Sequence, residues 1–418
     1  MAKSINKLKL CWLGKNNFLK EYFRVLKNKG IGDANRFVKW LNFVVDSERL
    51  LEHDEKGVIH FFIPPTPSKS FARIMRSYND SYILKRKKIP LHNVLISTTR
   101  KCPFNCWYCS AASTPESNMK IDDISKIVSI LKEWDVCLIG FTGGEPLLRT
   151  DTDEIIRKNA DQFTFTIFTS GYGLDRARAQ KLKEYGLFYV AISLDDYDNK
   201  RHDEARGSKG AFEISIKAIN NAKEAGLYTV VQSVITKSML NSGQIWKFMK
   251  FVKKLDVDEL LLLEPLATGK LFNCGNDVFL NKEEHEQLKL LHNIAQKNHE
   301  LPKICSFANI EDPTRFGCGA GIEHSYIDTE GNFWPCNFLP LSLGNILEEP
   351  DAVYSRLERY FSTPCKYCIL MAERKELQIL FDGKLPVPFE KAKGFLEERL
   401  NRIGKDEKPR FYKLLEGK

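Results

Sequence analysis

Residues 92–109 of the chain read HNVLISTTRKCPFNCWYC, and this stretch decides how the fold is interpreted. Its first part, residues 92–98, is a short apolar run that predicts a buried strand. Three thiols follow within eight residues, at Cys102, Cys106 and Cys109. Because the three lie in one tight loop directly after a strand, they can converge on a single metal centre.

The cysteine content of the whole chain favours metal binding over disulfides. The chain has 418 residues and 11 cysteines, and its first 20 residues carry five lysines without the sustained apolar run of a secretory signal. We therefore expect a cytoplasmic protein, in which disulfides are disfavoured. A zinc site would need a fourth ligand close to the three thiols, whereas a [4Fe–4S] cluster held by three thiolates keeps one iron open for a substrate or cofactor.

Short apolar runs alternate with helical patterns between residues 90 and 270. Six β–α repeats of this kind predict an α/β fold, a partial (β/α)6 TIM-type barrel, because a closed barrel needs eight. Functional residues of such folds lie at the carboxyl ends of the strands. The predicted strands are residues 92–98, 136–142, 163–169, 187–194, 228–236 and 258–264, and the predicted helices include residues 121–134, 175–185, 212–225 and 245–255.

Motifs that suit ligand binding follow the second, third and fourth predicted strands. The second strand ends in two glycines and a carboxylate; glycine lets the backbone approach a ligand closely, and a carboxylate accepts hydrogen bonds from an ammonium group. Serine hydroxyl groups lie at the ends of the next two strands, and an aspartate and an arginine follow the fourth strand. The residues singled out are Gly143, Gly144, Glu145, Ser170, Ser193, Asp195 and Arg206.

The three-thiol spacing, with an aromatic residue before the last cysteine and the Gly143-Gly144-Glu145 motif after the next strand, closely resembles the radical S-adenosylmethionine (radical SAM) superfamily. The resemblance implies a [4Fe–4S] cluster on the three cysteines and S-adenosylmethionine on its open iron. It also implies that Gly143, Gly144 and Glu145 meet the methionine amine, that Ser170, Ser193 and Arg206 hold the ribose and carboxylate, and that Tyr108 lies near the adenine. Asp196 stands where relatives usually have glycine.

A second set of four cysteines lies in the Cys-, Pro- and Gly-rich stretch 301–370. Thiols in two separated pairs suit either a zinc ribbon or a [4Fe–4S] cluster with four protein ligands. Their order resembles the twitch/SPASM extension of radical SAM enzymes, which implies an auxiliary [4Fe–4S] cluster. No cysteine follows this set, so the shorter twitch form with one auxiliary cluster is implied. The four residues are Cys318, Cys336, Cys365 and Cys368.

Composition changes along the chain predict five regions. A helical amino-terminal region with a short strand at residues 58–63 carries seven of the nine net positive charges in its first 50 residues. Such a basic segment is either a solvated helix face or a contact for an acidic partner. The regions expected are residues 1–89, a partial barrel at 90–270, a helical linker at 271–300, a twitch/SPASM-like domain at 301–370 and a helical tail at 371–418.

A radical formed on a substrate can lose a proton, so a general base is expected on a strand-end loop. Glu264 and Asp195 are candidates, and the amide of Gln232 could orient a group there. Cys274 and Cys305 lie near the predicted domain junctions, where a thiol either donates a hydrogen atom or packs as a small apolar side chain. Each candidate also fits a purely structural role.

The resemblance implies an enzyme that cleaves S-adenosylmethionine to a 5′-deoxyadenosyl radical and oxidises or crosslinks a peptide or protein side chain. A small-molecule oxidoreductase or cofactor-biosynthesis enzyme of the dehydrogenase type is the alternative, and an iron–sulfur electron carrier is a third. The implied partners are a flavodoxin- or ferredoxin-type electron donor and the substrate. No stretch has the length of a membrane span, and no aromatic-interleaved basic motif indicates nucleic acid, so neither partner is expected.

Overall fold

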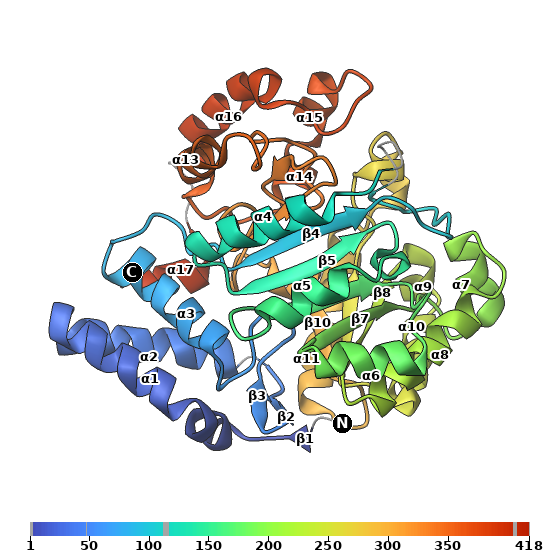
Figure 1. Cartoon of the computed structure of the whole chain (residues 1–418), viewed down its shortest axis with the longest axis horizontal. Helices are drawn as coiled ribbons and strands as arrows, with labels where there is room; N and C mark the ends of the chain where they lie inside the picture. Colours follow the sequence, from blue (N-terminus) through green and yellow to red (C-terminus); the bar gives the residue numbers. More distant parts are fainter. Residues whose placement is uncertain (1–2, 47, 112–116, 404–407, 418) are drawn as a thin grey trace.

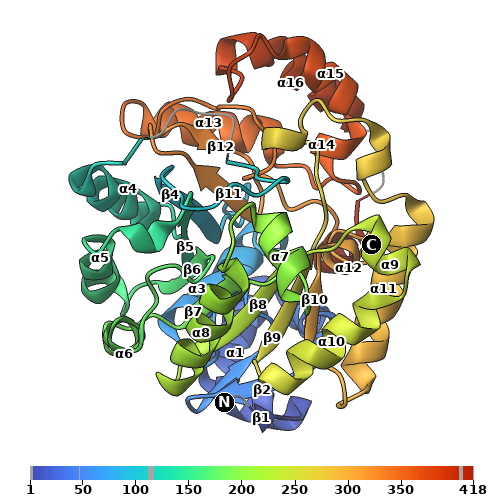
Figure 2. The same cartoon turned by 90° about the vertical axis from the view of Figure 1, so that its right-hand side faces the viewer.

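The computed structural model describes residues 3–46, 48–111, 117–403 and 408–417. A twisted nine-stranded sheet forms its centre, and helices cover the outer face of that sheet (Figures 1 and 2). The strands are β1 (Lys3–Ser4), β2 (Leu51–His53), β3 (Lys56–Val58), β4 (Asn93–Thr99), β5 (Leu138–Gly143), β6 (Thr164–Thr169), β7 (Tyr189–Ser193), β8 (Tyr228–Val234), β9 (Glu259–Leu263), β10 (Ile304–Ser306), β11 (His324–Ile327) and β12 (Phe333–Trp334).

The helices alternate with the strands through the barrel region and gather at both ends of the chain. They are α1 (Lys7–Lys29), α2 (Ile31–Asp46), α3 (Lys69–Tyr78), α4 (Ile121–Glu133), α5 (Thr152–Asn159), α6 (Arg176–Glu184), α7 (Asn199–Arg206), α8 (Ala211–Glu224), α9 (Lys237–Asn241), α10 (Gln244–Leu255), α11 (Lys282–Lys297), α12 (Phe307–Ile310), α13 (Pro350–Phe361), α14 (Ile369–Ala372), α15 (Arg374–Leu380), α16 (Phe389–Ile403) and α17 (Arg410–Glu416).

The predicted partial barrel is confirmed. Strands β4 to β9 lie side by side in sequence order, and each pairs in parallel with the next. Connections between parallel neighbours need a crossover, which the intervening helices supply. The carboxyl ends of these six strands therefore meet at one end of the barrel, where the cysteine loop follows β4.

The sheet extends beyond the six predicted strands. Strand β10 pairs in parallel with β9, and β11 pairs in parallel with β4 at the opposite edge before β12 turns back against it. These strands come from residues 304–334, so the sheet crosses the boundary that we predicted at residue 301, while the division into domains stays a prediction. Strands of two to four residues are too short for their hydrophobic periodicity to be recognised.

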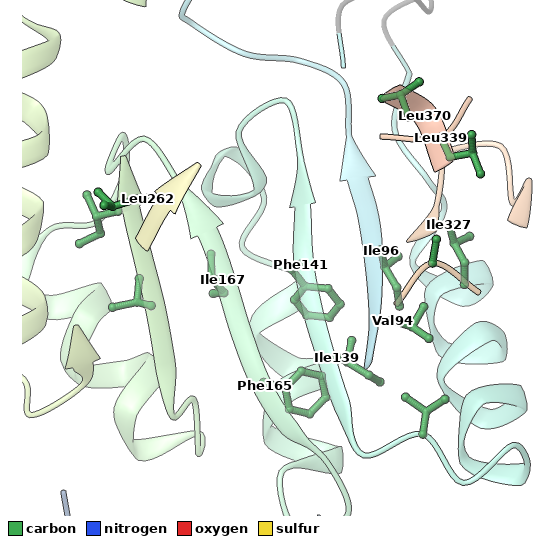
Figure 3. Close-up of a cluster of buried hydrophobic side chains, with 14 of the residues drawn as sticks. Val94, Ile96, Ile139, Phe141, Phe165, Ile167, Leu262, Ile327, Leu339 and Leu370 are labelled. Atoms are coloured by element: carbon green, nitrogen blue, oxygen red, sulfur yellow. The ribbon is translucent and has the colours of Figure 1, made fainter. Parts of the chain in front are cut away.

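Alternate residues of the barrel strands supply two cores. Residues facing outward pack against the surrounding helices, and Figure 3 shows part of this cluster, including Ile139, Phe141, Phe165 and Ile167 on neighbouring strands. Inward-facing residues at the amino end of the strands, such as Tyr189 and Tyr228, form a second cluster. Each strand is thus buried on both faces, as parallel strands usually are.

The amino-terminal region closes one end of the barrel. The strand predicted at residues 58–63 is wrong in its extent: β3 ends at Val58, and Phe61 instead packs among the inward-facing barrel residues. The apolar residues of this run fill the interior of the barrel. A short apolar run in the sequence looks the same whether its residues fill a barrel or form a buried strand. Helices α1 to α3 pack outside, together with Phe411 and Tyr412 of α17.

Candidate functional site

One cavity of about 500 Å³ runs from the carboxyl ends of the strands into the barrel. Its upper wall contains the three cysteines of the 102–109 loop and the ends of β5 to β9. Its depth is lined by apolar and aromatic side chains, including Phe71, Met75 and Phe168. The cavity therefore joins the predicted metal centre to an interior suited to a partly apolar ligand.

The cysteine loop is held by backbone contacts from two other segments. The amide of Asn105 donates to the Arg206 carbonyl over 2.9 Å at the end of α7, and the amide of Lys270 donates to the Cys109 carbonyl over 3.0 Å. Burial raises the pKa of the Cys102 thiol to about 12, so an uncompensated thiolate is disfavoured there. A metal bound to the sulfur would supply the missing positive charge.

Gly143 and Gly144 bring two backbone segments together. Gly143 has φ +129°, and a Cβ on it would lie 2.1 Å from the Thr99 carbonyl oxygen. A Cβ on Gly144 would lie 2.2 Å from the carbonyl oxygen of Lys101, directly before Cys102. Only glycine fits at either position, and both line the cavity beside the cysteine loop.

Glu145 faces the interior of the protein. One oxygen of its carboxylate accepts hydrogen bonds from Thr169 Oγ1 (2.6 Å) and the Leu147 amide (3.0 Å). The other oxygen accepts from the Ser170 amide (2.8 Å) and from the Ser170 hydroxyl. Burial raises the pKa of Glu145, and these four donors oppose the shift. Gly143, Gly144 and Ser170 line the cavity, whereas the fully buried Glu145 fixes the loop that carries Ser170.

Asp195, Tyr108 and Arg206 form one cluster beneath the cysteine loop. The Arg206 Nε lies 2.9 Å from Asp195 Oδ2, which also accepts from the Tyr108 hydroxyl. The other oxygen of Asp195 accepts from the Val234 amide at 3.0 Å. Arg206 in turn places Nη1 3.6 Å from the sulfur of Cys106. A guanidinium at this distance stabilises negative charge on that sulfur.

Two further candidates lie at the ends of β8 and β9. Gln232 donates from Nε2 to Ser193 Oγ over 2.9 Å, and both residues line the cavity. Glu264 also lines it, and the Glu264 carboxylate lies 3.2 Å from Nε2 of His285 on α11. The Glu264 carboxylate raises the pKa of His285, which favours the ion pair. Glu311 lines the same wall, and burial together with Glu264 raises its pKa to about 8.

The structure brings the four later cysteines together from three separate segments. The Cys318 amide donates to the Cys365 carbonyl over 2.9 Å, and the Phe338 amide donates to the Cys336 sulfur at 3.4 Å. Burial raises the pKa of the Cys336 thiol to about 12, and burial likewise raises the pKa of Cys318 and Cys368. Amides that point at buried sulfurs suit thiolate ligands of an iron–sulfur cluster.

All 11 cysteines have free thiols. Among the described side chains, no group of three or more His, Cys, Asp or Glu converges in a way that could hold a single metal ion. Each thiolate on a cubane binds a different iron, so its ligands are spread more widely than those of one zinc ion. Thiol-only donor sets are chemically suited to an iron–sulfur cluster and also to zinc.

Comparison with known proteins identifies one domain of the chain. The model of the radical SAM superfamily matches residues 96–252, from the middle of β4 to the end of α10. The chain contains a radical SAM domain. Enzymes of this superfamily use a [4Fe–4S] cluster and S-adenosylmethionine, so these are the cofactors of the domain, and a reductant is needed as well.

Relatives differ in what they are named for. An AdoMet-dependent heme synthase of Oleidesulfovibrio alaskensis is 25% identical over 298 residues, which cover 64% of this chain and 76% of that protein. A probable GTP 3′,8-cyclase of Methanocella arvoryzae is 32% identical over 165 residues, which cover 39% of this chain and 53% of the cyclase. Sequence similarity thus reaches enzymes with different substrates.

A solved structure shares the fold. Streptococcus suis SuiB bound to its precursor peptide SuiA aligns with a TM-score of 0.53 and 19% identity, over 68% of this chain and 70% of SuiB. SuiB has also been crystallised with S-adenosylmethionine. The shared architecture covers more of the chain than the superfamily model alone.

Several residues at the site were not predicted from sequence. Thr169 is the last residue of the strand predicted at 163–169, and its contact with Glu145 depends on the sheet order. Lys270, His285 and Glu311 come from segments outside the recognised motifs, and no sequence signal marks them. Lys270 Nζ bonds the Cys106 carbonyl oxygen at 2.8 Å, which helps to fix the cysteine loop.

Proposed function

We propose that this radical SAM enzyme carries out a two-electron oxidation of a substrate bound in the barrel cavity. One observation carries the proposal: the 102–109 loop and the backbone beside two of the four later cysteines, Cys318 and Cys336, line the same cavity. Gly317 and Gly319 flank Cys318, Asn337 and Phe338 follow Cys336, and all four reach the cavity wall. A substrate in that cavity would lie between the two cysteine sets.

The residues for each cofactor follow from the site. Cys102, Cys106 and Cys109 would hold the first cluster, with S-adenosylmethionine against Gly143, Gly144, Ser170 and Ser193. Cys318, Cys336, Cys365 and Cys368 would hold one auxiliary cluster in a twitch-like domain. When bound, these groups supply a 5′-deoxyadenosyl radical that takes a hydrogen atom from the substrate and an acceptor for the electron that remains.

Arg206 and Glu145 support this site through neighbouring residues. Arg206 would balance the charge of the Cys106 thiolate while Asp195 and Tyr108 hold its guanidinium in place. Glu145 would fix Ser170 and the turn after β6. We therefore assign Glu145 a positioning role and leave direct contact with the methionine amine to the backbone around Gly143 and Gly144.

Glu264 is the best-placed group to accept the substrate proton. The Asp195 carboxylate pairs with Arg206 and accepts hydrogen bonds from Tyr108 and the Val234 amide, so we assign it to holding Arg206 in place and not to the substrate proton. Gln232 is an amide and has no basic site. Glu264 lines the cavity, and its carboxylate lies 3.2 Å from Nε2 of His285. Loss of a hydrogen atom, an electron and then this proton completes the two-electron oxidation.

We favour a compact substrate over a long peptide. The cavity is deep and largely apolar, and the first cluster and S-adenosylmethionine would occupy part of its volume of about 500 Å³, so the remainder suits a small molecule or a single side chain. The heme synthase and GTP cyclase names of the relatives point the same way. A peptide side chain is the second candidate, because SuiB holds a precursor peptide on the same architecture.

Deuterium transfer tests the proposal and separates the candidates. The anaerobically reconstituted enzyme would be mixed with reductant, S-adenosylmethionine and deuterated tetrapyrroles, nucleotides or peptides, and 5′-deoxyadenosine would be analysed by mass spectrometry. Deuterium in that product identifies the substrate class. Absence of 5′-deoxyadenosine under every condition would contradict radical chemistry and favour the iron–sulfur electron carrier. The free thiols also lead us to propose a reducing compartment such as the cytoplasm.

A further inference from the structure

Helix α1 has one buried face and one exposed face. Its inner face packs on the protein through Leu10, Gly14, Glu21 and Val25, which recur at the spacing of a helix. The helix lies at the periphery of the molecule, near the end of the barrel where the strands begin (Figure 1). The outer face of α1 is therefore accessible to another surface.

Large apolar side chains run along that outer face. Leu8, Trp12, Leu19 and Phe23 are 80%, 64%, 51% and 58% exposed. At 100° per residue these four positions fall within a sector of about 60°, so they form one straight stripe along the helix. We call these four residues the α1 stripe. Exposed apolar residues scattered singly need no explanation, but an aligned set of this size marks an interaction site.

Lysines border the α1 stripe on both sides. Lys20 and Lys27 lie on one flank, together with Lys9, whose ammonium pairs with Glu52 of β2, and Lys15 and Lys29 lie on the other flank. Lys15 also places its ammonium 5.4 Å from the centre of the Trp12 ring. The single acidic residue of the helix, Glu21, is buried and paired with Arg24 at 2.7 Å. The exposed surface of α1 thus carries only positive charge.

We propose that α1 lies in the interface of an anionic lipid bilayer, with the α1 stripe among the upper acyl chains and the lysines at the headgroups. A straight stripe of Trp, Phe and Leu between two rows of lysines is complementary to such a flat, negatively charged surface. This contact needs no spanning helix, and the described residues include none long and apolar enough to cross a membrane. The proposed membrane contact is thus peripheral, whereas the sequence led us to expect no membrane partner. The proposal is independent of the proposed function.

Vesicle binding of the full-length reconstituted enzyme tests the proposal. Vesicles of equal parts phosphatidylglycerol and phosphatidylcholine should sediment the enzyme, and vesicles of pure phosphatidylcholine should bind it far more weakly. The double variant Leu19→Glu with Phe23→Glu should weaken binding by at least about tenfold, and Lys20→Glu alone by about fivefold. Ile379→Glu on α15 is the matched control, because Ile379 is 83% exposed on another helix and should leave binding unchanged.

A second readout keeps the test independent of folding defects. Vesicles should shift the tryptophan emission of the enzyme to shorter wavelength, and Trp12→Phe should remove most of that shift while cluster content stays unchanged. Equal binding of wild type and the double variant would overturn the proposal. Failure of the wild type to bind the mixed vesicles would overturn it as well. If the double variant then also lost a dimer, or a complex with an acidic protein, the α1 stripe would be a protein interface.

Discussion

The two cysteine sites differ in how they are built and in the charges beside them. The first takes all its thiols from one loop, with Arg206 3.6 Å from Cys106 and the Lys270 ammonium on the loop's carbonyls. The second collects four thiols from separate segments, with the acidic Glu311 nearby. The three thiols of the first site line the cavity beside Arg206 and Lys270, whereas the second site has the acidic Glu311 beside it. This contrast fits one site that binds a charged cofactor and another that handles only an electron.

Removing either cysteine set should separate the two roles most sharply. The reconstituted parent should hold about eight irons, and the triple variant Cys102→Ala, Cys106→Ala, Cys109→Ala about four, with no 5′-deoxyadenosine formed. Cys318→Ala with Cys336→Ala should also hold about four irons but still produce 5′-deoxyadenosine. Iron and zinc analysis with product chromatography would check this. A parent with about four irons plus zinc would contradict the auxiliary cluster.

Glu264→Gln should uncouple the two half-reactions. Because general-base catalysis contributes about 10²- to 10⁴-fold, formation of oxidised substrate should fall by that factor. Cleavage of S-adenosylmethionine should change little, because the proposed role of Glu264 is to accept the substrate proton after that cleavage. Gln232→Glu is the matched control at the end of the neighbouring strand. Equal losses of 5′-deoxyadenosine and product in Glu264→Gln would assign this residue to substrate binding instead.

Arg206→Met should destabilise the first site. It leaves the Asp195 carboxylate buried without its cation, which costs about 3–5 kcal/mol in comparable buried pairs. Chemical denaturation would measure the loss, and the double variant with Asp195→Asn should recover much of it. If the double variant is as unstable as Arg206→Met alone, packing of the long side chain outweighs the charge pair.

Matched glycine substitutions should disturb one site at a time. A Cβ on Gly144 would lie 2.2 Å from Lys101 O, and one on Gly317 would lie 2.5 Å from Cys365 O. Gly144→Ala should weaken S-adenosylmethionine binding, and Gly317→Ala should lower auxiliary iron, each with a loss of about 1–3 kcal/mol from overpacking. Gly32→Ala, where no heavy atom lies within 4 Å, is the neutral control. Calorimetric titration and iron analysis distinguish the effects.

Glu311→Gln should have the smallest effect, on pH dependence. The pKa of Glu311 is raised to about 8 in the folded chain, so between about pH 4.5 and 8 the folded state holds a proton that the unfolded state releases. Wild-type stability should therefore fall as pH rises through this range, and the variant should show a flatter decline. Denaturation midpoints measured at several pH values would check it, and an unchanged slope would contradict the assignment.

The same contrast explains what the sequence could predict. The first cysteine site and the six barrel strands were predictable, because the thiols lie within eight residues and the strands are long enough to show their pattern. The short strands β10 and β11 were missed because three or four residues carry too little periodicity. Lys270, His285 and Glu311 were missed because only tertiary packing brings them to the cavity. Phe61 was placed in a strand because barrel-filling and strand residues are equally apolar.

The contact between the two ends of the chain bears on the timing of folding during synthesis. Phe411 of α17 packs against Trp40 of α2 with ring centroids 5.6 Å apart, and the buried Glu323 carboxylate accepts from the hydroxyls of Tyr78 and Tyr412 at 2.9 and 2.8 Å. The earliest helices thus share a core with one of the last. This shared core is complete only after α17 has left the ribosome, so the apolar residues that α17 covers stay available to chaperones until then.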